Sequence, residues 1–186
     1  MRASPALRAG LLAVLLAAGP QVRADALGAL LEALDLTAPR HRLAAPGFRL
    51  DALGGGSGGP DDYAGKALLL HFWATFCDPC RDELPRLEAL SRQLGEEGLV
   101  VLTVAVDRSP AAAVAAFVAV GGYRLPVLLD PLGRVRNRYE VAVLPTSYLI
   151  GRDGRFVARA LGARGWDAPD AVAALRSWLR QGAGSP

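Results

Sequence analysis

The sequence predicts an α/β fold in which a central mixed sheet is flanked by helices on both faces. Strand-like apolar segments alternate with segments of helical periodicity along most of the 186 residues. Residues 66–74 and 99–106 are nearly continuous apolar runs, as expected for strands buried on both faces of a sheet. The hydrophobic fraction of 52% is sufficient for a core, so we do not expect disorder over most of the chain.

The first 24 residues have the features of a secretory signal peptide. Arg2 and Arg8 provide a basic start, residues 9–18 form an uncharged apolar run, and the predicted cleavage point lies before Asp25. A run of about ten residues is shorter than the ~20 that a membrane-spanning helix needs. We therefore expect an exported, periplasmic or otherwise extracytoplasmic protein, with an uncleaved membrane anchor as the alternative.

Residues 25–45 are predicted to form a helical extension before the main domain, which takes residues 46–186. Leucines recur at positions i, i+3, i+4 and i+7 within residues 25–38, which indicates a short amphipathic helix that Pro39 ends. Residues 48–50 alternate as a strand does. The glycine-rich residues 54–60 are interpreted as a flexible turn, because they lack the Gly-Lys-Ser/Thr ending of a phosphate-binding loop.

The remaining elements continue the alternation of strands and helices. After the strand at 66–74, regularly spaced leucines predict a helix over 81–94, which Pro85 should kink and Gly95 should end. The elements predicted after it are strand 99–106, helix 110–120, strand 126–129, helix 132–139, strand 147–150, strand 156–161 and helix 167–180. A Gly-Arg-Asp-Gly turn at 151–154 makes the last two strands a hairpin.

The chain has two cysteines, Cys77 and Cys80, in a C-x-x-C arrangement between a predicted strand and a predicted helix. A disulfide that closes so short a loop adds little stability, and a structural zinc site needs four ligands. The only histidines are His41 and His71, and there is no second C-x-x-C. These counts favour a redox-active pair that needs no other cofactor and no metal.

At the start of a helix, unpaired backbone N–H groups and the helix dipole favour a thiolate over a thiol. We therefore expect the pKa of Cys77 to lie below the ordinary ~8.5 of a free cysteine. Cys80 is within reach to attack a mixed disulfide, and Pro79 suits the first turn of a helix. Asp78 acts in the opposite direction, because its charge disfavours a second anion nearby, and this favours a reductant over an oxidant.

Two further ionisable residues flank the cysteines. Glu83 lies three residues after Cys80 and could accept its proton, or could simply be a solvated helix charge. His71 lies within the apolar strand, where a hydrogen-bonded core histidine and a proton relay are both open interpretations. Farther along, Pro145 precedes a predicted strand, a position where a cis peptide bond can occur.

The charge of the chain does not indicate nucleic-acid binding. Three of the 21 basic residues lie in the predicted signal peptide, which leaves 18 basic and 18 acidic residues in the rest of the chain. No cluster of basic residues with interleaved aromatic residues is present in the sequence.

The segment HFWATFCDPCRDELPRLEAL, residues 71–90, resembles the thioredoxin superfamily and most closely its exported TlpA/ResA branch, which includes the cytochrome c maturation thioredoxins. Residues 99–107 and the segment LPVLLDPLGRVRNRYEVAVLPTSYLIGRDGRF, residues 125–156, support the resemblance. It covers residues 46–179 and implies a thioredoxin-like fold. Residues 110–130 would be the extra helix and strand of this branch.

The resemblance also implies roles for individual residues. Cys77 would be the nucleophile, Cys80 the resolving thiol, Glu83 the active-site glutamate and Pro145 the cis-proline that faces the cysteines. The substrate-binding surface would comprise Pro145 with Leu144, Phe76 and Trp73, and the supporting residues would be His71, Asp78 and Pro79. Phe76 stands where the family usually has tryptophan, and Val143 replaces a common glycine, so partner choice could differ.

The sequence therefore predicts a thiol-disulfide oxidoreductase that reduces protein disulfides, such as those of apocytochrome c or of metal-site cysteines. The resemblance implies a membrane thiol donor as the source of electrons, and a monomer is expected. The alternatives are a copper-binding chaperone for oxidase assembly, a disulfide-introducing oxidase and a peroxiredoxin. A peroxiredoxin would need a Thr/Ser-x-x-Cys site, whereas Cys77 is preceded at that distance by Ala74.

Overall fold

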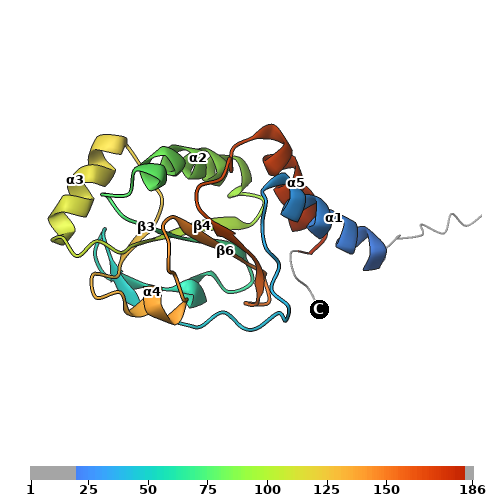
Figure 1. Cartoon of the computed structure of the whole chain (residues 1–186), viewed down its shortest axis with the longest axis horizontal. Helices are drawn as coiled ribbons and strands as arrows, with labels where there is room; N and C mark the ends of the chain where they lie inside the picture. The colour runs from blue at the N-terminus through green and yellow to red at the C-terminus, as the bar shows by residue number, and fades with distance from the viewer. Residues whose placement is uncertain (1–19, 183–186) are drawn as a thin grey trace, which may run out of the picture.

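Seven strands form one mixed sheet in the computed structural model, which describes residues 20–182 (Figure 1). The strands are β1 Leu50–Ala52, β2 Ser57–Gly58, β3 Ala67–Trp73, β4 Leu99–Ala105, β5 Val127–Leu129, β6 Thr146–Ile150 and β7 Phe156–Leu161. Their order across the sheet is β2-β1-β5-β4-β3-β6-β7. The central strand β3 is parallel to β4 and antiparallel to β6, which confirms the predicted α/β fold with a mixed sheet.

The described residues also form five α-helices and one 3₁₀ helix, and none of these helices is long and apolar enough to cross a membrane. The helices are α1 Pro20–Ala33, η1 Pro60–Tyr63, α2 Asp78–Leu94, α3 Ala111–Gly121, α4 Arg134–Arg138 and α5 Pro169–Arg180. Figure 1 shows α2 and α4 on opposite faces of the sheet, and α1 beside α5. The predicted helix-and-strand insertion at 110–130 corresponds to α3 and β5.

The alternation of side chains along β3 divides the core into two clusters. Leu69 packs with the buried leucines of α2 and with α1 and α5 on one face of the sheet. Leu68, Leu70 and Phe72 point to the other face, where they pack with the residues around α4. All seven residues of β3 are buried, as its continuous apolar sequence predicts. His71, two residues after Leu69, points to the same face of the sheet as Leu69 and therefore toward α2.

The N-terminal helix differs from its predicted bounds. It ends at Ala33 instead of residue 38, because Asp35 adopts a left-handed conformation (φ 47°) and Leu36 N–H donates to Leu31 C=O at 2.8 Å. This is a helix-ending motif that apolar spacing does not reveal. Leu30 and Leu34 pack against α5 in the core. Of the predicted signal peptide, residues 1–19 lie outside the described part of the chain.

The glycine-rich segment is ordered as a hairpin and not as a loose turn. β1 and β2 pair antiparallel, and β1 begins at Leu50, two residues later than the predicted strand. Gly59 follows the hairpin, and a Cβ atom there would lie 2.0 Å from the carbonyl oxygen of Phe48. The backbone at Gly59 lies so close to the backbone of Phe48 that only a residue without a side chain fits there.

The packing of β3 on α2 predicts a large stability cost for a truncation. Leu69→Ala removes a side chain that is fully buried, so the free energy of unfolding should fall by about 3 kcal/mol. Urea unfolding at neutral pH measures the difference. Val120→Ala, at a position that is 91% exposed, serves as the control and should change stability by less than about 0.5 kcal/mol. Equal losses in the two variants would contradict this description of the core.

Candidate active site

The two cysteines lie where β3 passes through a short turn into α2, and the structure joins them in a disulfide. Cys77 is the N-cap residue of α2, and Cys80 N–H is directed at Cys77 Sγ at 3.3 Å. Pro79 lies in the first turn, where its missing N–H breaks no helical bond. Cys77 is 9% exposed and Cys80 is fully buried, so Cys77 is the sulfur that a partner can reach.

The charges nearest the cysteines on the surface belong to one ion pair. The side chain of Asp78 is 87% exposed, and Arg81 Nη1 lies 3.4 Å from its Oδ1. The Arg81 guanidinium also lies over the ring of Phe117, 5.9 Å from the centroid. Because both charges are exposed and paired, the effect of Asp78 on Cys77 is smaller than the sequence alone suggests.

Glu83 lies one helical turn after Cys80 and is almost completely buried, with 1% of its surface exposed. Its Oε1 accepts the Arg164 N–H at 3.0 Å and the indole N–H of Trp166. Its Oε2 has no hydrogen-bond partner among the described residues. Burial raises the pKa of Glu83 to about 7, although the two hydrogen bonds and the charges of Arg164 and Arg86 act in the opposite direction. The carboxyl group can therefore gain or lose a proton near neutral pH.

His71 faces Glu83 from β3. Its Nε2 lies 3.9 Å from Glu83 Oε2, and its Nδ1 shares a hydrogen bond of 2.9 Å with Ser147 Oγ on β6. Burial lowers the pKa of His71 to about 3, so the ring is neutral at physiological pH. At 3.9 Å the two side chains are neighbours without a direct hydrogen bond. His71 is thus a hydrogen-bonded core histidine, and it also lies next to Glu83.

Three residues that no sequence pattern indicated hold His71 and Glu83 in place: Ser147, Arg164 and Trp166. Arg164 and Trp166 lie in the loop between β7 and α5, about eighty residues from Glu83 in the chain. The guanidinium of Arg164 also donates to the carbonyl oxygens of Leu34 (2.8 Å) and Asp35 (3.2 Å), at the end of α1. The sequence offered one sign of these contacts, which is Trp166 in a loop that contains glycines, but a tryptophan in a loop does not indicate which residue it will contact.

The Leu144–Pro145 peptide bond is cis, at the position that the resemblance implied. Leu144 packs against the cluster that contains both cysteines. The carbonyl of Pro145 accepts Gly162 N–H at 2.8 Å, and Thr146 Oγ1 donates to Val143 C=O at 2.8 Å. In residues 20–182 the backbone N–H and C=O of Leu144 have no hydrogen-bond partner.

Exposed apolar side chains complete this surface, but Trp73 is not one of them. Phe76 is 70% exposed and Val143 is 49% exposed. Trp73 is completely buried at the end of β3, with its ring 5.5 Å from that of Phe117. The prediction that Trp73 contacts the substrate is therefore wrong, because the side chain packs beneath the surface and supports it from within.

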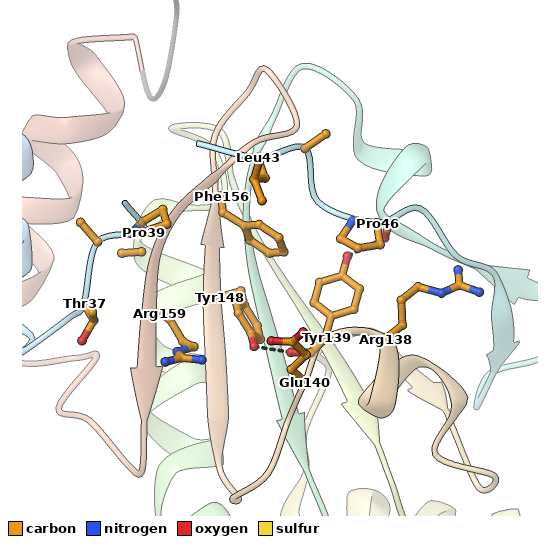
Figure 2. Close-up of a pocket in the computed structure, with 13 residues that line it drawn as sticks. Thr37, Pro39, Leu43, Pro46, Arg138, Tyr139, Glu140, Tyr148, Phe156 and Arg159 are labelled. Atoms are coloured by element: carbon orange, nitrogen blue, oxygen red, sulfur yellow. Dashed lines mark hydrogen bonds between the residues drawn. The ribbon is translucent and has the colours of Figure 1, made fainter. Parts of the chain in front are cut away.

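A pocket of about 460 Å³ lies elsewhere, on the face of the sheet away from His71 (Figure 2). Figure 2 shows Tyr139, Tyr148 and Phe156 around it, with Tyr148 Oη donating to the Tyr139 carbonyl. None of the residues that line it is a cysteine, so it is separate from the redox pair. In the described chain, no three His, Cys, Asp or Glu side chains are grouped so that they could hold a metal ion.

The contacts of Glu83 predict a shift in its titration. Trp166→Phe keeps an aromatic ring but removes the N–H that stabilises the carboxylate, so the pKa of Glu83 should rise further above 7. Carbon-13 NMR of the glutamate side chains, assigned with Glu83→Gln, follows the titration. Trp178→Phe changes a buried tryptophan of the same core cluster and should leave it unmoved. A lower pKa in Trp166→Phe would contradict this description.

Comparison with known proteins agrees with this geometry. The model of the AhpC/TSA family matches residues 42–159. The thiol-disulfide oxidoreductase ResA of Bacillus thuringiensis (strain Al Hakam) is 35% identical over 118 residues, which are 63% of this chain and 68% of that protein. ResA of Bacillus subtilis (strain 168) is 34% identical over 118 residues, 63% of this chain and 65% of its own.

Solved structures share the fold. The thiol:disulfide interchange protein DsbE of Chlorobium tepidum has a TM-score of 0.68 at 28% identity, over 74% of this chain and 96% of that one. StoA of Bacillus subtilis has a TM-score of 0.60 at 23% identity, over 74% and 98%. With the cysteine pair at the start of α2, these likenesses identify the chain as a member of the AhpC/TSA family and as a thioredoxin-like thiol-disulfide oxidoreductase of the ResA type.

Proposed function

We propose that this oxidoreductase reduces disulfide bonds of proteins outside the cytoplasm, with the Cys77–Cys80 pair as its only redox group. The observation that carries the proposal is an accessible sulfur joined to a buried one, beside the buried and protonatable Glu83. A cycle of disulfide exchange uses an accessible attacking thiol and a second thiol that resolves the mixed disulfide, and a nearby proton acceptor assists the second thiol. The relatives named ResA and the DsbE structure support this class of activity.

The first step of the cycle is an attack by the Cys77 thiolate on one sulfur of the substrate disulfide. A bond forms between Cys77 Sγ and that sulfur, the substrate S–S bond breaks, and the other substrate sulfur leaves as a thiolate. The Cys80 N–H directed at Cys77 Sγ and the start of α2 stabilise the attacking thiolate. Because Cys80 is buried, the mixed disulfide forms at Cys77.

The second step releases the reduced substrate. The Cys80 thiol gives its proton to Glu83 and attacks Cys77 Sγ, which closes the Cys77–Cys80 disulfide and expels the second substrate thiolate. Two electrons have then passed from the protein to the substrate. Glu83 is suited to accept this proton because its pKa of about 7 lies close to the working pH. His71 stays neutral and polar at the back of this site.

The substrate would bind across the cis peptide bond. The unpaired N–H and C=O of Leu144 can pair with an extended substrate backbone, as at the edge of a sheet. Phe76 and Val143 offer apolar contact on either side. Apocytochrome c and proteins with metal-site cysteines are the proposed substrates, on the basis of the resemblance to the TlpA/ResA branch.

The buried carboxyl group of Glu83 and, more weakly, the exposed Asp78 support this direction of electron flow. Asp78 and the carboxyl group of Glu83 lie near the cysteines, and Arg81 is the cation beside them. Anionic surroundings destabilise the thiolate and therefore favour loss of electrons. We propose that a membrane thiol protein reduces the pair again and that the protein acts as a monomer, exported by its N-terminal segment.

The reduction potential of the Cys77–Cys80 pair tests the direction. Equilibration with dithiothreitol or glutathione buffers should give a value near or below that of thioredoxin, about −270 mV. Cys80→Ser, which cannot form the internal disulfide, is the control for the signal. A value near that of DsbA, about −120 mV, would exclude a reductant and would indicate a protein that introduces disulfides.

The role of Glu83 predicts a pH-dependent second step. In the unchanged protein, release of the reduced substrate should speed up as pH rises through about 7, because only ionised Glu83 can accept the Cys80 proton. Glu83→Gln should abolish this rise of the rate with pH and should slow release about 100-fold. Single-turnover release of a fluorescent peptide from the mixed disulfide gives the rate. Asp82→Asn, on an exposed side chain of the same turn, should retain the wild-type profile; the same profile in Glu83→Gln would argue against a catalytic carboxyl group.

A further inference from the structure

A second buried carboxyl group lies beside the cysteine turn, at the end of β4. Asp107 is 3% exposed, and all its hydrogen bonds come from Thr75. Thr75 N–H lies 3.1 and 3.2 Å from the two carboxylate oxygens, and its hydroxyl group donates to Oδ1. Over residues 20–182, no basic side chain forms an ion pair with Asp107. A buried carboxylate without a cation is costly and calls for an explanation.

Thr75 lies in the turn that carries Cys77 from β3 to α2. The neighbouring backbone bonds are few: Cys77 N–H donates to Ala74 C=O at 3.2 Å, and Arg81 N–H donates to Cys77 C=O at 3.1 Å. The Asp107 carboxylate therefore ties the middle of the turn to the adjacent strand. Where Thr75 is held, the position of Cys77 at the first turn of α2 is held as well.

The charge of Asp107 also bears on the sulfur. Three sets of groups surround Cys77 along the chain: the Asp78–Arg81 ion pair on the surface, Cys80 N–H and buried Glu83 within α2, and Asp107, which is bound to Thr75 two residues before Cys77. Solvent screens the exposed ion pair, whereas it screens a buried carboxylate much less. Asp107 is thus a buried carboxyl group attached to the same turn as Cys77.

We propose that Asp107 is a positioning residue for the thiol chemistry: it fixes the turn before Cys77 through Thr75, and its buried charge keeps the Cys77–Cys80 pair reducing. Reduction of the disulfide adds two electrons and breaks the S–S bond, leaving a Cys77 thiolate and, after uptake of one proton, a Cys80 thiol. An anion near that thiolate destabilises the reduced state and lowers the reduction potential. This inference rests on the proposed function only in taking Cys77 as the attacking thiol.

The chain contains a closely matched control at the end of the next strand. Asp130 follows β5, is 1% exposed, and accepts the backbone N–H groups of Arg134 and Arg136 at 2.9 and 2.8 Å. It is therefore similarly buried and also binds backbone N–H groups, but it holds α4 and not the cysteine turn. Its replacement should cost similar stability without a direct effect on Cys77.

The test compares Asp107→Asn with Asp130→Asn in the full chain. The rate of iodoacetamide alkylation of the reduced protein against pH gives the pKa of Cys77, and dithiothreitol buffers give the reduction potential. Asp107→Asn should lower the pKa of Cys77 by about one unit, a tenfold rise in its acidity, and should raise the potential by about 30 mV if the same factor applies to the redox equilibrium. Asp130→Asn should leave both values unchanged. An unchanged pKa in Asp107→Asn, or equal shifts in both variants, would overturn the proposal.

The positioning role has its own readout, which also serves if Asp107→Asn does not fold. Thr75→Val removes the hydroxyl group and keeps the side-chain shape, so the amide hydrogen of Cys77 should exchange at least about tenfold faster with solvent, while amides of β4 stay protected. Thr75→Ser should restore the slow exchange. Equal exchange in all three proteins would refute the positioning role.

A separate variant distinguishes failure of this inference from failure of the proposed function. Cys80→Ser should trap a mixed disulfide between Cys77 and a disulfide-containing peptide. If no mixed disulfide forms, the proposed reductase cycle fails, yet the pKa of Cys77 still tests Asp107. If trapping succeeds and the pKa does not move, the inference about Asp107 alone is wrong.

Discussion

The carboxyl group of Glu83 is kept away from water, and much of the structure contributes to that constraint. β3 and β6 form the floor with His71 and Ser147, α2 carries Glu83 itself, and the loop before α5 closes over it with Trp166. These segments are far apart in the chain. Burial raises the pKa of this carboxyl group, and the two N–H donors to its Oε1 lower it again. The balance leaves a group that exchanges protons at neutral pH.

The cysteine pair lies across the boundary between this dry region and solvent. Cys77 is at the N-terminus of α2, where the backbone stabilises a thiolate, and Cys80 is one turn deeper beside Glu83. The order of events in disulfide exchange therefore follows from accessibility. Carboxyl groups flank the pair on the exposed side at Asp78, which is paired with Arg81, and on the buried side at Asp107, which binds the turn through Thr75.

The sequence predicted those parts of the fold and site that depend on local patterns. β3, α2 and the cysteine turn follow from a continuous apolar run, leucine spacing and the C-x-x-C itself. The three-residue spacing of Cys80 and Glu83 also predicted that the two side chains lie on neighbouring positions of the helix. Partners such as Trp166 could not be predicted, because their contacts depend on how a distant loop returns to α2. Trp73 was placed wrongly, since a residue at a strand end can turn outward or pack under a neighbouring helix, and only the tertiary contact with Phe117 decides.

Arg164 links the N-terminal helix α1 to the buried carboxyl group of Glu83. Its backbone N–H binds Glu83, while its guanidinium holds the carbonyl oxygens of Leu34 and Asp35 at the end of α1. Leu30 and Leu34 pack in the same cluster as Trp166. A shortened chain that began at residue 46 would retain both cysteines and every strand of the sheet, yet it would lose the contacts of α1 with Arg164 and with the cluster that contains Trp166. The residues that hold Glu83 in place therefore extend beyond the segment that carries the redox motif, and a comparison of relatives by that motif alone would overlook them.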